Sequence, residues 1–324
     1  MITLEDIRKP VSREMKEFNS RFKSEISSDI LLVNLVTRFV LRKKGKQMRP
    51  LFVFLSSRLT GEITDSTYTA ASLVELMHTA TLVHDDVVDE SNERRGTFSV
   101  KAIWKSKVAV LFGDYLLAQG LLLAVRNKDY DLLEIISNAS REMSEGELLQ
   151  IQKSRSLNID LDTYYEVIRK KTASLIATCT ASGAKAAGAS PATVDQVYQM
   201  GIQIGMAFQI KDDLFDYQPH GVIGKPTGND IKDKKFTLPL IYALNQAEPA
   251  RRKSIIRKIK NGNRSQHVVN EVIQFVNDMG GIDFAITKMQ EYKSAAMEIL
   301  HSFPESPARN SLRDLVEFTV SRKK

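Results

Sequence analysis

Cysteine is almost absent from this chain, because Cys179 is the only one among 324 residues. A single cysteine excludes an internal disulfide framework and favours a reducing compartment. Free cysteine is usually buried, so we interpret Cys179 as an inert core residue. Strand-like alternation is also scarce, whereas apolar residues recur at three- and four-residue spacing. This pattern predicts an all-α fold.

The sequence also lacks an obvious export signal or membrane span. Residues 1–16 are polar and mixed in charge, without the apolar core of a signal peptide. The longest apolar stretch, 115–125, is interrupted by Gln119 and Gly120 and is shorter than a bilayer span. We therefore expect a cytoplasmic protein with at most peripheral membrane contact.

Basic residues are in excess, with 46 Lys and Arg against 39 Asp and Glu, a formal net charge of +7. This charge favours anionic partners without identifying them. The densest basic run, 251–260, carries Ile255, Ile256 and Ile259 at helical spacing. We favour a solvated helix face here over a nucleic-acid or membrane patch. Because aromatic residues are not interleaved with the charges, no nucleic-acid partner is expected.

Turn-forming residues divide the chain into segments of helical length. The Ser190-Pro191 pair predicts a helix start, with the hydroxyl as N-cap and proline in the first turn. No low-complexity linker marks a boundary, so we expect one domain, 1–324, of ten or so helices. The predicted breaks lie at 60–66, 188–191, 218–229, 261–264 and 303–307.

Two acidic motifs share the pattern Asp-Asp-x-x-Asp. They comprise Asp85, Asp86 and Asp89 in the first motif, and Asp212, Asp213 and Asp216 in the second. Apolar helical patterns precede both motifs, which places them near helix ends. On a helix the three carboxylates of a motif lie close together, so their repulsion must be offset by cations. Magnesium is the natural ion, since it takes one or two carboxylates and completes its shell with water and phosphate oxygens.

Cationic and hydrogen-bonding residues surround the acidic motifs in the sequence. Lys46 and Arg49 lie three residues apart, a spacing suited to a phosphate group. Arg94 and Arg95 follow the first motif, and His78 lies seven residues before Asp85 on nearly the same helix face. The remaining donors are Lys171, Thr172, Lys225 and Lys235. Each alone would be a surface charge, whereas together they indicate a site for diphosphates.

The ordered motifs GKQMRP, HTATLVHDDVVDESNERRG, KT, FQIKDDLFD, GKPTGND and KKFTLPL resemble the trans-isoprenyl diphosphate synthase (polyprenyl synthetase) family across 43–240. The stretch 78–96 is most similar to octaprenyl-type, long-chain synthases. The resemblance implies a single-domain all-α isoprenoid synthase fold around a deep central cavity, with both acidic motifs at its mouth, and a homodimer. Lys44 and Lys234 replace glycines that the family often has.

The resemblance also implies a role for each matched residue. The six aspartates would bind Mg²⁺, three ions with substrate bound, bridging an allylic diphosphate. Contacts to that diphosphate would come from Arg94, Lys171, Thr172, Gln209, Lys225 and Lys235. The diphosphate of isopentenyl diphosphate would be held by Lys46, Arg49, His78 and Arg95. The catalytic set would be Asp85, Asp86, Asp89, Arg94, Lys171, Asp212 and Lys235.

The implied reaction is ionisation of the allylic diphosphate, condensation with isopentenyl diphosphate, and elimination of a proton. The expected product is a long-chain all-trans polyprenyl diphosphate, for a quinone side chain; geranylgeranyl or farnesyl diphosphate is the alternative. Small Ala80 and Thr81 below the first motif should leave the product tunnel open, although Met77 could form a floor. The basic residues Lys46, Arg49 and Arg95 argue for elongation and against a terpene cyclase. Two intact acidic motifs argue against a non-catalytic partner subunit.

Overall fold

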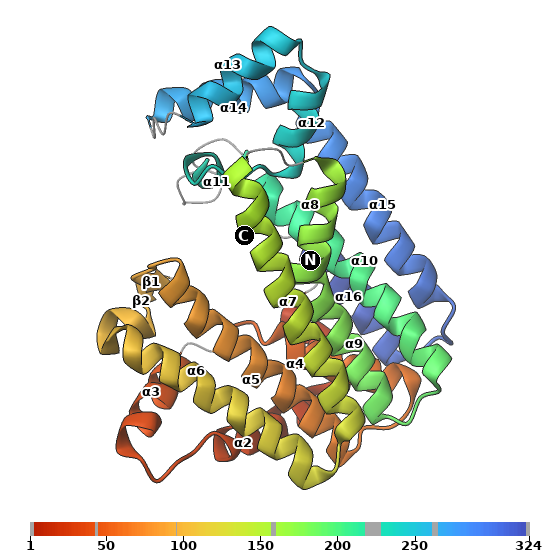
Figure 1. Cartoon of the computed structure of the whole chain (residues 1–324). Coiled ribbons are helices and arrows are strands. Elements are labelled where there is room, and N and C mark those ends of the chain that lie inside the picture. Colours follow the sequence, from red (N-terminus) through yellow and green to blue (C-terminus); the bar gives the residue numbers. More distant parts are fainter. Residues whose placement is uncertain are drawn as a thin grey trace. The chain divides into compact units, whose positions relative to one another are not determined.

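The computed structural model describes residues 3–42, 45–94, 96–156, 160–217, 228–260 and 265–321, without the side chains of 154–156 and 229. Within these ranges the chain forms sixteen α-helices and one two-stranded ribbon, which confirms the all-α prediction (Figure 1). This number exceeds the ten or so helices expected, and two of the sixteen are only four or five residues long. The α-helices are α1 (Leu4–Arg8), α2 (Ser12–Glu25), α3 (Leu31–Arg42), α4 (Met48–Thr60), α5 (Asp65–Val88), α6 (Val100–Asn127), α7 (Tyr130–Ser156), α8 (Leu161–Ile168), α9 (Ser174–Ala186), α10 (Pro191–Phe215), α11 (Asn229–Lys232), α12 (Leu238–Gln246), α13 (Pro249–Lys260), α14 (Gln266–Asp278), α15 (Gly281–His301) and α16 (Pro307–Ser321). The other elements are the 3₁₀-helix η1 (Lys9–Val11), the π-helix η2 (Arg169–Ala173), and strands β1 (Glu93–Arg94) and β2 (Thr97–Phe98).

Several predicted breaks separate these helices. The break at 60–66 falls between α4 and α5, and the break at 303–307 falls between α15 and α16. At 188–191 the Ser190 hydroxyl accepts a 3.2 Å hydrogen bond from the Thr193 amide, and α10 begins at Pro191. The predicted N-cap is therefore confirmed. The break at 261–264 and most of that at 218–229 lie outside the described residues.

The chain folds into two compact units. Unit 1 comprises Met1–Ser140, Thr178–Tyr198 and Phe303–Leu312, and unit 2 comprises Arg141–Ala177, Gln199–Ser302 and Arg313–Lys324. Helices α7, α9, α10 and α16 each contribute residues to both units. The single domain expected over 1–324 stays a prediction.

Aromatic contacts organise the core of unit 1. The ring of Phe54 on α4 meets Phe18 of α2 at 6.0 Å and Tyr68 of α5 at 5.2 Å, both edge-on. Phe18 and Phe54 are fully buried. Burying each such ring stabilises the fold by about 1.5–3 kcal/mol, and edge-on pairing adds about 0.5–1.5 kcal/mol. These contacts anchor α5, the helix that ends in the first acidic motif.

In unit 2, glycines allow close helix packing. A side chain on Gly205 of α10 would collide with Ala173, because a Cβ there would lie 2.4 Å from the Ala173 Cα atom. A Cβ on Gly281 of α15 would lie 2.3 Å from the Pro239 carbonyl oxygen in α12. The same two helices join through Tyr242 and Phe284, whose rings stack at 4.0 Å. Gly205 therefore lets α10, which ends in the second acidic motif, approach η2, which contains Lys171 and Thr172.

Helix α6 departs from the sequence expectation. It runs over 28 residues and contains a window of mean hydropathy 1.9, one third of which is buried. By length and composition it is the one helix of the described residues that could cross a membrane. The sequence expectation concerned only the stretch 115–125, which is shorter than a span, whereas the whole helix meets the criteria of length and composition. One such helix is weak support for a membrane span, because core helices share these properties.

Candidate active site

The first acidic motif lies at the C-terminal end of α5. Asp85 and Asp86 are in the last turn, and the Asp89 amide closes the helix by donating a 2.8 Å hydrogen bond to the Asp85 carbonyl oxygen. Asp86 is buried, Asp85 is half-buried and Asp89 is exposed. The carboxylates thus pass from protein interior to solvent along one helix end, as a site for a hydrated ion requires.

Arg94 pairs with the buried member of this motif. Its Nε donates a 2.7 Å hydrogen bond to Asp86 Oδ1. The backbone supports the pair, since β1 and β2 form an antiparallel ribbon with Arg94 opposite Thr97, and the Ser91 amide donates to the Asp86 carbonyl oxygen at 3.0 Å. A charge-assisted bond of this kind is about twice as strong as a neutral one. Arg94, predicted to contact a diphosphate, is therefore held beside the first motif.

Helix α6 fixes the direction of the motif. A side chain on Gly113 is excluded, because a Cβ there would lie 2.1 Å from His84 Nε2. The His84 ring nitrogen lies 3.1 Å from the Val110 carbonyl oxygen and 3.6 Å from the Asp114 carboxylate. His84, immediately before the acidic pair, thus anchors the end of α5. Sequence reasoning did not assign it this structural role.

The residues predicted to set chain length lie deeper in α5. Ala80 and Met77 are buried, with Ala80 fully enclosed by protein atoms. Thr81 is half-buried, and its hydroxyl donates a 2.9 Å hydrogen bond to the carbonyl oxygen of His78, which is itself buried. Burial is compatible both with a tunnel wall and with ordinary helix packing. The chain-length role of these residues stays a prediction.

Lys46 and Arg49 lie at the start of α4. Gln47 has a left-handed backbone with φ of 45° and precedes the first helical residue, Met48. The Gln47 side-chain Nε2 donates a 2.8 Å hydrogen bond to Asn19 Oδ1, and the guanidinium of Arg8 donates to the Lys46 carbonyl oxygen. Both contacts fix this tight turn. Lys46 is exposed and Arg49 half-buried, so the predicted basic pair lies on one ordered turn.

The second acidic motif lies at the C-terminal end of α10, and its middle aspartate is held on both oxygens. Asp213 is buried. Its Oδ2 accepts a 2.6 Å hydrogen bond from the Tyr164 hydroxyl, and its Oδ1 accepts a 2.9 Å hydrogen bond from the side-chain Nε2 of Gln209. Burial raises the pKa of Asp213 to about 7; the charges of Asp230 and Asp212 contribute to this rise, and the hydrogen bonds from Tyr164 and Gln209 oppose it. The site therefore disfavours this negative charge unless a cation is added.

A fourth carboxylate, Asp230, joins this cluster from α11. Its amide donates a 2.7 Å hydrogen bond to Asp216 Oδ2, and its carbonyl oxygen accepts a 2.7 Å bond from the Lys235 amide. Burial, followed by repulsion from Asp216, raises the pKa of Asp230 to about 6. The Lys235 ammonium lies 3.9 Å away and opposes this rise. Sequence reasoning missed Asp230, although its Gly-Asn-Asp context was part of a quoted motif.

The Lys171-Thr172 pair lies in the π-helix η2. A Cβ on Gly146 of α7 would approach within 3.0 Å of the Lys171 amide nitrogen, so only glycine lets α7 pack this closely. Lys171 Nζ donates a 3.1 Å hydrogen bond to Gln150 and forms an ion pair with Glu147, two residues that sequence reasoning missed. π-helical turns are frequent at functional sites.

A hydrogen-bonded chain links this element to the second motif. The Thr172 hydroxyl donates a 2.9 Å bond to Gln209 Oε1, and the Gln209 amide in turn bonds Asp213. Three residues predicted from sequence are thereby joined. Such outer contacts fix the orientation of ligands and tune their charge.

The structure thus brings predicted residues together within each unit. In unit 1 these are Asp85, Asp86, Asp89 and Arg94; in unit 2 they are Lys171, Thr172, Gln209, Asp212, Asp213, Asp216 and Lys235. Arg95 and Lys225 lie outside the described residues. Among those described, no three His, Cys, Asp or Glu side chains converge to hold a metal ion by themselves.

Solved structures of other proteins share this fold. The fold superimposes on a polyprenyl synthase from Caulobacter crescentus complexed with calcium and isoprenyl diphosphate, with a TM-score of 0.90 and 32% identity over 99% of this chain and 98% of the other. A geranylgeranyl pyrophosphate synthase from Bacteroides thetaiotaomicron gives a TM-score of 0.83 and 36% identity over 98% of both chains. The chain therefore has the all-α isoprenoid synthase fold.

Sequence comparison agrees with the fold. Residues 32–276 match the Polyprenyl synthetase family. The octaprenyl diphosphate synthase of Escherichia coli is 31% identical over 99% of both chains. The all-trans-nonaprenyl-diphosphate synthase (geranyl-diphosphate specific) of Rhodobacter capsulatus is 35% identical over 98% of both chains. This chain belongs to the polyprenyl synthetase family and is a trans-prenyltransferase.

Proposed function

We propose that the enzyme extends an allylic diphosphate with isopentenyl diphosphate to a long-chain all-trans polyprenyl diphosphate. The carrying observation is the partly buried acidic cluster of unit 2, where burial and neighbouring carboxylates raise the pKa of Asp213 and Asp230. A cluster that disfavours its own charge is a site for cations that arrive with an anionic substrate. The names of the full-length relatives support the long-chain product.

Magnesium suits the donors present, because all six assigned ligands are aspartates and offer carboxylate oxygens. We propose that Asp85, Asp86 and Asp89, with Asp212, Asp213 and Asp216, hold three ions when substrate is bound. Calcium, another hard ion that prefers oxygen ligands, accompanies isoprenyl diphosphate in the Caulobacter relative. When bound, Mg²⁺ would supply positive charge to the allylic diphosphate.

The protein's own cations would complete this stabilisation. Arg94, Lys171 and Lys235 would bind the allylic diphosphate as its carbon–oxygen bond breaks and the electron pair leaves with oxygen. Arg94 can keep its Nε bond to Asp86 while its other N–H groups contact phosphate. Lys171 would exchange part of its contact with Glu147 for the substrate. Thr172 and Gln209 would position these groups and Asp213, while Lys225 would add a further cation.

The second substrate would bind through its own diphosphate. We assign this group to Lys46, Arg49, His78 and Arg95. Holding two diphosphates in fixed positions brings the double bond of isopentenyl diphosphate to the allylic cation, which supplies much of the rate enhancement. A proton then leaves the new carbon–carbon adduct, and the departing diphosphate is our proposed acceptor.

Product length is the finer part of the proposal. Small Ala80 and Thr81 support a tunnel longer than a geranylgeranyl tail, and a quinone side chain is the proposed use of the product. Geranylgeranyl diphosphate remains the second candidate, since the Bacteroides relative with 36% identity carries that name.

We also propose a homodimer. Helix α6 exposes a stripe of large apolar side chains, Leu111, Leu121, Leu122 and Val125. Leu121, Leu122 and Val125 lie ten, eleven and fourteen positions after Leu111, so the four side chains share one helix face. Large exposed apolar side chains on one helix face are a recognised mark of a protein interface. The cytoplasmic location expected from the sequence stays a prediction.

Product analysis tests the proposal. The purified chain would be incubated with Mg²⁺, labelled isopentenyl diphosphate and a geranyl, farnesyl or geranylgeranyl primer, and the dephosphorylated products sized by chromatography. We expect polyprenols longer than twenty carbons. Products that stop at fifteen or twenty carbons would support the alternative, and cyclic hydrocarbons without label would contradict prenyl elongation.

A further inference from the structure

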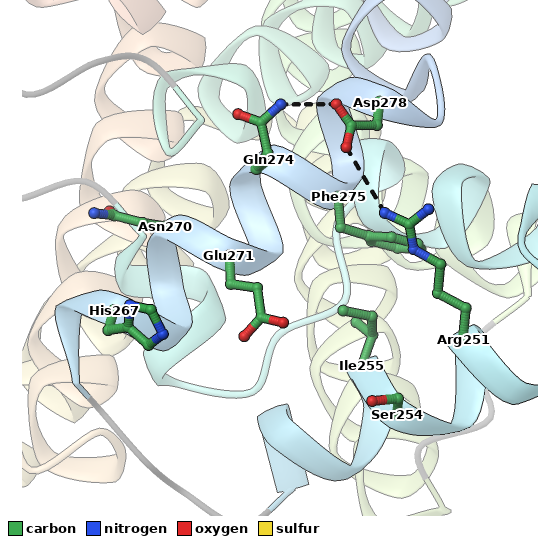
Figure 2. A pocket seen from close by; sticks show the side chains of 9 residues that line it. All are labelled: Arg251, Ser254, Ile255, His267, Asn270, Glu271, Gln274, Phe275 and Asp278. Atoms are coloured by element: carbon green, nitrogen blue, oxygen red, sulfur yellow. Dashed lines mark hydrogen bonds and ion pairs between the residues drawn. The ribbon is translucent and has the colours of Figure 1, made fainter.

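The basic run of the sequence forms α13, whose inner face packs on α14 in unit 2 (Figure 1). Ile255 and Ile259 of α13 are buried. Figure 2 shows Arg251 directed toward α14, where its guanidinium lies 5.3 Å from the centre of the Phe275 ring and 3.7 Å from the Asp278 carboxylate. The helix is therefore amphipathic, with part of its positive charge turned inward.

The inward cations neutralise the acidic residues of α14. That helix contains two carboxylates, Glu271 and Asp278. Glu271 forms an ion pair with Lys258, and Asp278 pairs with Arg251 and accepts a 2.7 Å hydrogen bond from Gln274. Helix α13 has no acidic residue of its own. No carboxylate of α13 or α14 is therefore left to offset further positive charge.

Four other cations occupy the outer face of α13: Arg252, Lys253, Arg257 and Lys260. All four are exposed, and none forms an ion pair within the described part of the chain. Lys253, Arg257 and Lys260 repeat at four- and three-residue intervals along one side of the helix, and Arg252 lies at the edge of that side. From Arg252 to Lys260 they extend over about 12 Å at 1.5 Å per residue. We call these four residues the α13 basic face.

We infer that the α13 basic face docks the enzyme on an anionic lipid bilayer. A row of cations spread over two helical turns complements a surface of diffuse negative charge, whereas a single phosphate would require converging donors. No aromatic residue lies in α13, so the stacking that accompanies nucleic-acid binding is missing from this face. The choice of a membrane also rests on the proposed function, because a long polyprenyl tail is soluble only in lipid.

The expected binding is electrostatic and reversible. Each exposed Lys or Arg near an anionic bilayer strengthens binding about fivefold, so four together contribute two to three orders of magnitude. Large apolar side chains are not exposed on α13, and only Ile256 is half-buried there. Binding should therefore weaken steeply as salt rises.

Vesicle flotation tests this inference without any substrate. The full chain would be mixed with vesicles of phosphatidylcholine containing phosphatidylglycerol, or of phosphatidylcholine alone, in about 0.1 M salt, where the screening length is about 10 Å. The test variant carries R252Q, K253Q, R257Q and K260Q. A matched control carries R13Q, K16Q, K23Q and K107Q, which removes four exposed cations from α2 and α6.

We expect the unmodified chain and the control to float with anionic vesicles, and the test variant to lose at least a hundredfold in binding. Equal losses in both variants, or no binding by the unmodified chain, would overturn the inference. So would retention of a short DNA duplex in preference to the vesicles. Turnover in vesicle-free buffer separates the two proposals: product without vesicle binding overturns docking only, and vesicle binding without product supports docking while overturning the proposed reaction.

Discussion

The Tyr164 hydroxyl donates a 2.6 Å hydrogen bond to Asp213 Oδ2, and both side chains are buried. Because Gln209 occupies the other carboxylate oxygen at 2.9 Å, the middle aspartate of the second motif has a fixed orientation. Tyr164 comes from α8, 49 residues before Asp213. Burial raises the pKa of this phenol well above its ordinary value, so it remains a donor at every physiological pH.

We predict that Tyr164→Phe lowers metal affinity or turnover about 10–100-fold, the usual cost of losing a hydrogen bond to a metal ligand. Tyr165→Phe is the matched control, because the Tyr165 hydroxyl has no hydrogen-bond partner among the described residues. Activity would be measured across Mg²⁺ concentrations for both variants, with thermal unfolding alongside. Identical Mg²⁺ dependence in the two variants would show that Tyr164 does not position Asp213.

The acidic motifs predict an absolute requirement for a divalent ion. Asp85→Ala and Asp212→Ala should each reduce turnover by orders of magnitude while the fold is retained, because charge on the leaving diphosphate is no longer offset. Asp195→Ala, which removes an exposed carboxylate from α10, should leave turnover unchanged. Steady-state assays with and without excess chelator measure both effects. Turnover that survives the chelator would rule out the metal assignment.

An open tunnel beside Ala80 and closed packing around it predict different outcomes for Ala80→Phe. If Ala80 borders an open tunnel, the ring enters that space and products become shorter while the protein stays folded. If the site is closed packing, as full burial also permits, the ring overpacks the core at a cost of about 1–3 kcal/mol. Product sizing together with thermal unfolding distinguishes these cases. A destabilised enzyme with unchanged product length would contradict the tunnel reading.

Cys179 should be chemically silent in the folded protein. Burial raises its pKa to about 12, an effect that the nearby charge of Arg49 partly opposes. At pH 8 only about one thiol in ten thousand would be ionised, and the buried sulfur is shielded from reagents. A chromogenic disulfide reagent should therefore detect one thiol after denaturation and none before. Rapid reaction of the native protein would show that the surrounding core opens.

The sequence pattern was sufficient to predict that the two acidic motifs lie at helix ends, because an apolar helical pattern precedes each of them. Ser190 and Pro191 gave a correct helix start, since capping depends on neighbours in the chain. The basic run was correctly predicted as a helix, with Ile255 and Ile259 turned inward.

Partners that lie far apart in the sequence could not be predicted. Tyr164 and Glu147 have no local feature that reveals their contacts with Asp213 and Lys171. Asp230 was visible as an acidic residue 14 positions beyond Asp216, but only the fold shows the hydrogen bond between them. The exposed apolar face of α6 was also hidden, because polar residues interrupt its apolar sequence while the helix gathers the apolar side chains on one side.

The π-helix η2 changes which helix face the following side chains occupy. The Ser174 amide donates to the Arg169 carbonyl oxygen, five residues back instead of four. One residue more than an α-helical turn is thereby accommodated, and everything beyond it is rotated by about 100° relative to an uninterrupted helix. Lys171 and Thr172 reach different partners, Glu147 on α7 and Gln209 on α10, from within that widened turn. Deleting one residue of the turn would restore a regular helix and move the side chains beyond it to other helix faces. The packing of this segment therefore constrains its length.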